Sequence, residues 1–236
     1  MCCSRAGRES HRTEARTIEM KITDTLRDAA LDLWDEAAEK PFIKAMAKGT
    51  LDEGLFRNYM VQDYLYLLDY IETLRLMLEY TKSDDLRDFI LGTIAETEKE
   101  TYRVHLPQMK ALGVSDEDIS ESVLLPVIVE YNDYMRTQLR EKGLIAGLAA
   151  LLQCSWVYAY IARHIQTGYA KDLETSPYRS WFHAYSCKEY LDSNQKWIDI
   201  LDREAAGIDS DSLADLAAIF RKCAEYENAL WDALMQ

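Results

Sequence analysis

The sequence predicts an all-α protein, folded as a single-domain helical bundle. Glycine and proline are scarce, at 9 and 4 of 236 residues, whereas β-sandwiches and barrels need many turn residues. Apolar residues recur at the spacing of an amphipathic helix through most of the chain, and no stretch alternates with the period of a strand. Because the linkers are short, we expect roughly 70% of the chain or more to be helical and to pack around one core.

The acidic composition argues against nucleic acid and membrane partners. Lysine and arginine number 27 against 41 aspartates and glutamates, a formal net charge of −14, and a field of that sign repels phosphate backbones and anionic lipids. No glycine-rich nucleotide motif occurs. The 5 cysteines include no C-x-x-C pair, and the 4 histidines are not spaced as metal ligands. We therefore expect a cytoplasmic protein without a metal site.

The start of the chain differs from the rest. Its first nineteen residues, MCCSRAGRESHRTEARTIE, contain four arginines and no apolar run, which a secretory signal would need. We predict a disordered tail over 1–19, followed by the helical domain over 20–236. Two alternatives stay open for this segment: Met20 as the true start of the protein, or a transit peptide.

The first four predicted helices have recognisable boundaries. Thr23 can cap a helix over 23–40, which Pro41 stops. A short helix over 41–48 ends at Gly49, a residue type that suits the left-handed position after a helix. Two long helices follow, over 52–81 and 83–112. The second begins at a serine cap, closes at a glycine and is expected to kink at Pro107.

Four more helices complete the predicted bundle, over 126–142, 144–167, 176–206 and 210–235. The second of these includes twenty residues without a charge, Gly143 to Ala162, which is the length of a membrane span. Its middle carries the polar residues Gln153, Cys154 and Ser155, and no second such segment exists to pack against it. We therefore predict the buried central helix of a soluble bundle.

A stripe of polar and aromatic residues follows one face of the predicted helix over 52–81. Asp63, Tyr66 and Tyr70 stand at i, i+3 and i+7, and Tyr59 lies one turn before them. A buried carboxylate must be paired or hydrogen-bonded, and tyrosine brings a hydroxyl that also needs a partner. The stripe is either a structural core face or the wall of a polar pocket.

Two further residues are candidates for chemistry. Cys154 lies at the centre of the uncharged helix, one turn before Tyr158, and is either a small buried hydrophobe or a nucleophile whose base comes from another helix. Glu227 lies between Cys223 and Trp231 at helical spacing and should point inward. Burial would raise the pKa of such a carboxyl toward the range for proton transfer, although a structural, hydrogen-bonded glutamate is equally consistent with the pattern.

Four segments together resemble one known family, the TenA family of thiaminase II enzymes, which have the haem-oxygenase-like helical fold. The similarity covers nearly everything after Ile22, and the segments occur in the family's order at compatible distances. They are GTLDEGLFRNYMVQDYLYL from Gly49, LAALLQCSWVYAYIA from Leu148, YRSWFHAY from Tyr178 and the closing EYENALWDA.

The resemblance implies roles for individual residues. Cys154 matches the nucleophile of the family's L-L-P-C-x-W-x-Y run, which identifies the chain with the cysteine-bearing branch. Asp63, in the Q-D-x-x-Y pattern with Tyr66, is implied to hold the aminopyrimidine ring and to help ionise the thiol. Glu227 matches the glutamate that donates and accepts protons. The substrate-binding tyrosines would be Tyr66, Tyr131, Tyr158 and Tyr185.

The chain also departs from the family pattern at three positions. Gln153 stands where the family usually has proline, and Leu230 replaces the aromatic residue before Trp231. The E-x-x-x-H pattern appears with Thr101 in place of the acid before His105, and we assign no role to that pair. These departures leave the preferred substrate open.

The implied function is hydrolysis of thiamin-related aminopyrimidines, releasing 4-amino-5-hydroxymethyl-2-methylpyrimidine through a covalent cysteine intermediate in thiamin salvage. The resemblance also implies a homotetramer and no metal or organic cofactor. It requires a tyrosine-walled cavity, large enough for one heterocycle, where the thiol meets both acids. The alternative is a non-catalytic helical regulator or sensor that binds a pyrimidine. A haem enzyme is disfavoured, because the segment 23–40 contains no histidine as axial ligand.

Overall fold

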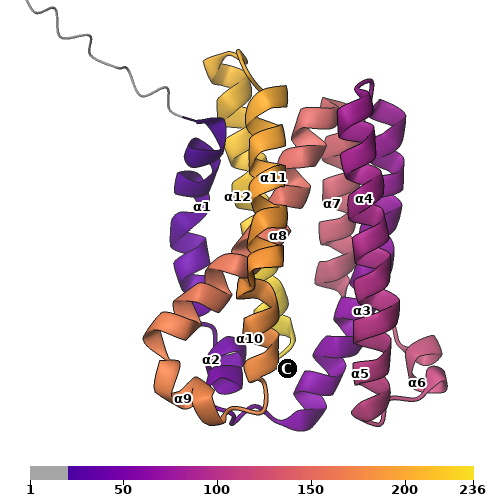
Figure 1. Ribbon diagram of the computed structural model, residues 1–236, viewed down its shortest axis with the longest axis vertical. Coiled ribbons are helices and arrows are strands. Elements are labelled where there is room, and N and C mark those ends of the chain that lie inside the picture. The colour runs from indigo at the N-terminus through magenta and orange to yellow at the C-terminus, as the bar shows by residue number, and fades with distance from the viewer. Residues whose placement is uncertain (1–20) are drawn as a thin grey trace, which may run out of the picture.

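The computed structural model describes residues 21–236, so the predicted tail over 1–19 lies outside the described residues. Figure 1 shows an elongated bundle of helices, and 85% of the described residues are helical, in agreement with the predicted 70% or more. The elements in chain order are α1 (Ile22–Ala38), α2 (Pro41–Ala47), α3 (Glu53–Tyr80), α4 (Asp84–Glu100), the π-helical turn η1 (Thr101–His105), α5 (Leu106–Ala111), α6 (Asp116–Glu121), α7 (Pro126–Lys142), α8 (Leu144–Gly168), α9 (Ala170–Thr175), α10 (Arg179–Ser186), α11 (Lys188–Glu204) and α12 (Ser210–Ala233).

The start of α1 is not capped as expected. Thr23 lies inside the helix, and its backbone N–H and its hydroxyl both donate to the carboxylate of Asp202 in α11, at 2.9 and 3.1 Å. A distant carboxylate therefore satisfies an N–H that a local cap would otherwise serve. The end of α2 is as predicted, because Gly49 has a φ of 67°, which a residue with a side chain adopts only with strain.

The long helix predicted over 83–112 is interrupted by the π-helical turn η1. We expected a kink at Pro107, but the irregularity lies just before it, and Pro107 occupies the first turn of α5, where a missing N–H costs little. The hydroxyls of Thr93, Thr97 and Thr101 each donate to the carbonyl four residues earlier, the last at 2.7 Å. Such back-bonding weakens a regular helix, and its series ends at the π turn.

Two short helices and one break were not predicted. The helix α6 begins with a capping box between Ser115 and Asp118, a signature that the sequence does contain. The helix α9 follows α8 after one residue. The helix predicted over 176–206 is split at Cys187, whose backbone is extended, with ψ at 158°. The prediction missed this break because no proline or glycine marks it.

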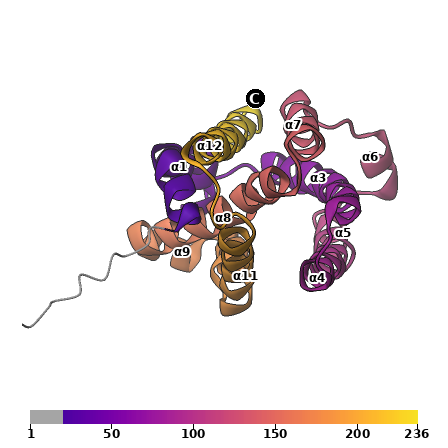
Figure 2. The same ribbon diagram turned by 90° about the horizontal axis from the view of Figure 1, so that it is seen from above.

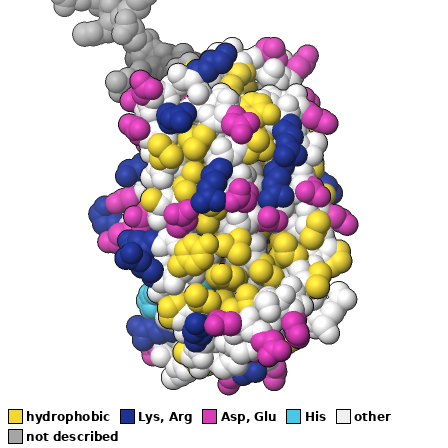
Figure 3. Space-filling view, turned by 90° about the vertical axis from the view of Figure 1, so that its right-hand side faces the viewer, with side chains coloured by type: hydrophobic (Ala, Val, Ile, Leu, Met, Phe, Trp, Pro, Cys, Tyr) yellow, Lys and Arg dark blue, Asp and Glu magenta, His cyan; other side chains and the backbone are white. Residues whose placement is uncertain are grey.

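The apolar helix α8 is the centre of the bundle. It packs against α1, α7, α10, α11 and α12, and Figure 2 shows it between α1, α7, α11 and α12 when the molecule is seen from above. By length and composition it is apolar enough to cross a membrane, but 67% of its most apolar window is buried inside the protein. This confirms the prediction of a core helix. Figure 3 shows charged side chains over the upper part of one side of the molecule and apolar side chains gathered lower down.

Candidate active site

One buried pocket gathers side chains from α3, α7, α8 and α12. Five of the predicted site residues line it, namely Asp63, Tyr66, Tyr131, Tyr158 and Glu227. The other two border it: the thiol of Cys154 accepts a hydrogen bond from the hydroxyl of Tyr66, and the ring of Tyr185 lies 4.9 Å from that of Tyr158. The remaining lining residues are Tyr59, Gln62, Val127, Ile128, Tyr226 and Leu230.

The candidate nucleophile has a protonated resting state. Burial raises the pKa of the Cys154 thiol well above its ordinary value, and the negative charges of Glu227 and Asp63 act in the same direction. The expectation that Asp63 helps to ionise the thiol was therefore wrong, because a nearby carboxylate disfavours a second negative charge. The hydroxyl of Tyr66, 3.1 Å from Sγ, opposes this effect by donating a hydrogen bond to the sulfur.

Glu227 is the candidate proton donor and acceptor. It comes from α12, where its side chain is only 2% exposed. Burial raises its pKa to about 8, while hydrogen bonding with Cys154 and Tyr131 acts in the opposite direction. Its Oε2 atom is buried without a hydrogen-bond partner among the described residues. At neutral pH it is thus mainly the uncharged acid, within reach of the thiol.

Asp63 has a partner that the sequence analysis did not assign. The Nε2 atom of His105 lies 2.6 Å from Oδ2 of Asp63, and both side chains are buried. Burial opposes the charged imidazole, but the hydrogen bond and charge of Asp63, together with the charge of Glu100, outweigh it and raise the pKa of His105. The hydrogen bond with Asp63 therefore favours the protonated imidazole of His105.

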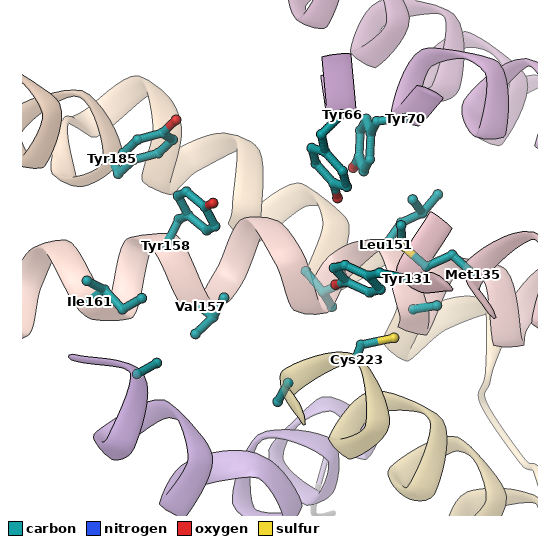
Figure 4. Close-up of a cluster of buried hydrophobic side chains, with 14 of the residues drawn as sticks. Tyr66, Tyr70, Tyr131, Met135, Leu151, Val157, Tyr158, Ile161, Tyr185 and Cys223 are labelled. Atoms are coloured by element: carbon teal, nitrogen blue, oxygen red, sulfur yellow. The ribbon is translucent and has the colours of Figure 1, made fainter. Parts of the chain in front are cut away.

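Three tyrosine rings form a stack across the pocket. Tyr66 and Tyr131 have ring centroids 6.2 Å apart at 20°, and Tyr131 and Tyr226 are 5.4 Å apart at 16°. Figure 4 shows Tyr66 coming from one side and Tyr131 from the other, with Tyr158 further along α8. The stack extends from the thiol of Cys154 toward the half-buried ring of Tyr226, so it forms a flat wall along the pocket.

The departure at Gln153 has a structural consequence in this pocket. The hydroxyl of Tyr131 donates to Oε1 of Gln153 at 3.0 Å, and both residues are buried. The Nε2 atom of Gln153 has no partner among the described residues. A proline at this position would offer no acceptor, so the glutamine fixes the direction of one tyrosine hydroxyl at the cost of an unsatisfied N–H.

The pocket is narrower than the expected cavity for a heterocycle. Together with the open solvent at its mouth it spans about 360 Å³. However, the space open to the centre of a water molecule is only about 10 Å³, which is room for roughly one water. The expectation was wrong in this conformation because the tyrosine rings stack on one another and fill the space between the walls.

The sequence analysis missed three residues at this site. Gln62 precedes Asp63 in the Q-D pattern, and its amide donates to the carbonyl of Val123 and accepts from the N–H of Leu125, at 3.0 and 2.8 Å, fixing the chain before α7. Its place in the pattern was a usable signal. His105 also stood in a noted pattern, whereas nothing marked Tyr226 as a wall of the pocket.

The fold and the pocket define the class of protein. Within residues 21–236, no three His, Cys, Asp or Glu side chains gather to hold a metal ion. The molecule is a helical bundle of the haem-oxygenase-like type, with a thiol, two acids and several tyrosines at its pocket. A domain of unknown function with this fold, from Shewanella denitrificans, superposes with a TM-score of 0.71 at 18% identity, over 92% of this chain and 93% of that one. The chain belongs to the TENA/THI-4/PQQC family, whose profile matches residues 27–236.

Individual relatives agree with this assignment. The chain is 29% identical to an aminopyrimidine aminohydrolase of Halalkalibacterium halodurans, over 90% of this chain and 95% of the relative. It is 25% identical to an aminopyrimidine aminohydrolase of Helicobacter pylori, over 92% and 100%. A solved TenA homologue from P. horikoshii superposes with a TM-score of 0.79 at 26% identity, over 91% and 98%. The resemblance inferred from the sequence is thereby confirmed at the level of family and fold.

Proposed function

We propose that this chain is an aminopyrimidine aminohydrolase, a hydrolase that cleaves the bond between a pyrimidine methylene group and an amine or thiazolium nitrogen. The observation that carries the proposal is the meeting of the Cys154 thiol with an uncharged Glu227 acid beside Asp63. Relatives at 25–29% identity with this name, aligned over nearly their whole length, support it.

The pocket offers a separate contact for each part of an aminopyrimidine. The ring would lie against the stacked tyrosines, because flat aromatic groups pack face to face at an offset. Asp63 would accept a hydrogen bond from the exocyclic amine. Glu227, buried and protonated, would face a ring nitrogen and supply its proton.

The first step is addition of the thiol across a carbon–nitrogen double bond of the ring. The sulfur of Cys154 bonds to the ring carbon, Glu227 gives its proton to the ring nitrogen, and Glu227 takes up the thiol proton. The acid is therefore regenerated as the thiol is consumed. Covalent addition divides a slow displacement into easier steps, and it avoids a free thiolate, which this pocket disfavours.

The remaining steps exchange the leaving group for water. Ring electrons form a double bond to the methylene carbon as the amine departs with the electron pair of its bond, taking a proton from the exocyclic amine through Asp63. Water adds to the methylene carbon, and its proton returns to the exocyclic nitrogen. The carbon–sulfur bond then breaks, and the proton on the ring nitrogen returns through Glu227 to Cys154. The net reaction consumes one water and releases one amine, or, from thiamin, one neutral thiazole and one proton.

A turnover assay on two substrates tests this proposal. Wild-type protein is incubated with thiamin and, separately, with 4-amino-5-aminomethyl-2-methylpyrimidine, and the released hydroxymethylpyrimidine is quantified. We expect release from at least one substrate, and quenched reactions should show a mass adduct on the peptide that contains Cys154. Tight binding without turnover would instead favour the non-catalytic sensor, and turnover without any adduct would overturn the covalent step.

The cellular setting is part of the same proposal. We place the protein in the cytoplasm, as a homotetramer without metal or organic cofactor. Apolar side chains gather on one side of the molecule (Figure 3), and Val123 is 81% exposed in the segment before α7. Exposed apolar patches of this kind are typical of protein interfaces. Light scattering measures the oligomeric state, and a monomer at micromolar concentration would contradict the assembly.

A further inference from the structure

His105 contacts only one of the two carboxylate oxygens of Asp63. The imidazole nitrogen Nε2 lies 2.6 Å from Oδ2 of the carboxylate, inside the protein. Among residues 21–236, the carboxylate of Asp63 makes its side-chain hydrogen bond to His105 through Oδ2. The Oδ1 atom of Asp63 has no hydrogen-bond partner among these residues. Since Asp63 lines the pocket, the arrangement leaves one carboxylate oxygen for a bound molecule.

The π-helical turn explains how His105 reaches this place. A π turn contains one residue more than an α-helical turn, which rotates the following side chains relative to a regular helix. His105 is the last residue of this turn and is buried, while Tyr102 and Val104 within the same turn are largely exposed. Such turns are frequent at functional sites, and here the turn brings His105 to Asp63, which lines the pocket.

We propose that His105 is a positioning residue for Asp63: His105 occupies one oxygen of the carboxylate and keeps the other oxygen as a pure hydrogen-bond acceptor. The pocket therefore selects 4-aminopyrimidines over 4-oxopyrimidines. This inference rests on the proposed function. An ionised carboxylate accepts hydrogen bonds and donates none. It therefore matches the N–H groups of an amino substituent and leaves the oxygen of an oxo substituent without a donor. A site that pairs a specific polar group rejects the analogue that lacks it by a large factor.

Several ionisable groups lie near Asp63, and His105 is the basic group among them. Tyr59 lies on the same helix as Asp63. The charge of Asp63 raises the pKa of Tyr59 and of side chains on five other helices. These are Glu100 on α4, Cys154 and Tyr158 on α8, Tyr185 on α10, Tyr190 on α11 and Glu227 on α12. Each of these groups is neutral when protonated and negative when ionised, so none of them stabilises a negative charge on Asp63 as a cation would. Removing His105 would therefore leave the charge of Asp63 uncompensated.

The test compares three variants by calorimetric binding of two ligands. The ligands are 4-amino-5-hydroxymethyl-2-methylpyrimidine and its 4-oxo analogue, measured between pH 5 and 9. His105→Ala removes the hydrogen bond and the charge, whereas His105→Gln keeps an N–H donor without the charge. His164→Gln is the matched control, because His164 makes a 3.0 Å pair with Glu39 outside the pocket. It should behave as wild type.

We expect wild-type protein to bind the amino ligand at least about 100-fold more tightly than the oxo ligand at pH 7. In His105→Ala this ratio should fall by about tenfold or more, and the pH at which the amino ligand begins to bind should rise. His105→Gln should fall between the two. Equal weakening of both ligands in the two variants, with an unchanged pH dependence, would show that His105 only supports the fold and would overturn the inference.

A second measurement separates this inference from the proposed function. The ¹³C signal of the Asp63 carboxyl group, assigned with Asp63→Asn, is titrated in wild type and in His105→Gln without any ligand. A higher titration midpoint in the variant supports the coupling even if the wild type shows no turnover. An unchanged midpoint overturns it even if the protein proves to be an active hydrolase.

Discussion

Two cysteines lie beside the same buried glutamate, and their surroundings differ. Cys154 on α8 is partly exposed and receives a hydrogen bond from Tyr66. Cys223 on α12 is fully buried, and Figure 4 shows it among apolar side chains next to Tyr131. Burial and the charge of Glu227 raise the pKa of both thiols well above the ordinary value. A thiol pKa therefore does not mark the nucleophile here. What separates the two is exposure, since only Cys154 is partly exposed, and the direction of the nearby phenol. The hydroxyl of Tyr66 donates to Cys154, whereas the hydroxyl of Tyr131, beside Cys223, donates to Gln153.

The largest predicted effect separates these two cysteines directly. Cys154→Ser should lower kcat/KM by at least about 1,000-fold, because serine in this pocket is a far weaker nucleophile. Cys223→Ala should change kcat/KM by less than about threefold and cost about 1 kcal/mol of stability, as for a small core truncation. Steady-state kinetics and urea unfolding of both variants make the comparison. Similar rate losses in the two variants would contradict it.

Replacing Glu227, the glutamate between the two cysteines, should lower the activity and raise the stability of the protein. Glu227→Gln removes the proton donor, and we expect kcat to fall by about 100-fold or more. The pKa of Glu227 is raised from 4.5 to about 8 in the folded protein, so the folded state binds the proton more tightly than the unfolded state. Its penalty is absent below pH 4.5 and grows as the pH rises toward 8.

The amide of this variant does not titrate, so it avoids that penalty. We expect the variant to exceed wild type in free energy of unfolding by on the order of 1–3 kcal/mol at pH 8, and to match it near pH 4.5. Urea denaturation at both pH values measures the difference. A variant that is less stable than wild type at pH 8 would contradict the assigned titration.

The phenol that distinguishes Cys154 should have a moderate effect. Tyr66→Phe removes the hydroxyl that donates to Sγ, so developing charge on the sulfur loses its donor, and kcat should fall by about tenfold. Tyr70→Phe is the matched control, since Tyr70 lies one turn further along α3 and is equally buried. If both variants lose the same activity, the hydrogen bond to Cys154 is not the cause.

The smallest predicted effect is a change in the pH dependence of kcat/KM when Gln153, which binds the tyrosine next to Cys223, is replaced. Gln153→Leu removes the acceptor of the Tyr131 hydroxyl. The single proton of that hydroxyl is then available to Glu227 alone, and the lowering that Tyr131 already exerts on the pKa of Glu227 should increase. The pKa of Glu227 should fall below about 8. The alkaline decline in kcat/KM should then begin at lower pH, with less than about a fivefold change at the optimum. A pH–rate profile that coincides with that of wild type would show that Gln153 does not act on Glu227.

The sequence predicted most of the fold because its helix boundaries are chemically explicit. The helix α7 begins at Pro126 and ends before Gly143, as expected, since proline and glycine specify these positions. The break at Cys187 has no such signal, and tertiary packing places it. The π turn was equally hidden, because the threonine side-chain hydrogen bonds that precede it also occur in regular helices.

The candidate site was only partly predictable for a similar reason. The spacing of Asp63 and Tyr66 places them on one helix face, and that face is buried as predicted. The approach of Cys154 to Glu227 joins two distant helices, so the resemblance and not the spacing anticipated it. The role of His105 depends on the π turn, and the width of the pocket depends on how the rings pack. Neither follows from periodicity.

The stacked tyrosines have a consequence for affinity. An aromatic ring entering between Tyr66 and Tyr131 has to separate two rings whose centroids are 6.2 Å apart, so each binding event exchanges a contact within the protein for a contact with the guest. The measured affinity is then the difference between two stacking energies of similar size. The stacking of Tyr66 on Tyr131 thus competes with ligand binding, which favours modest affinity and rapid release of product.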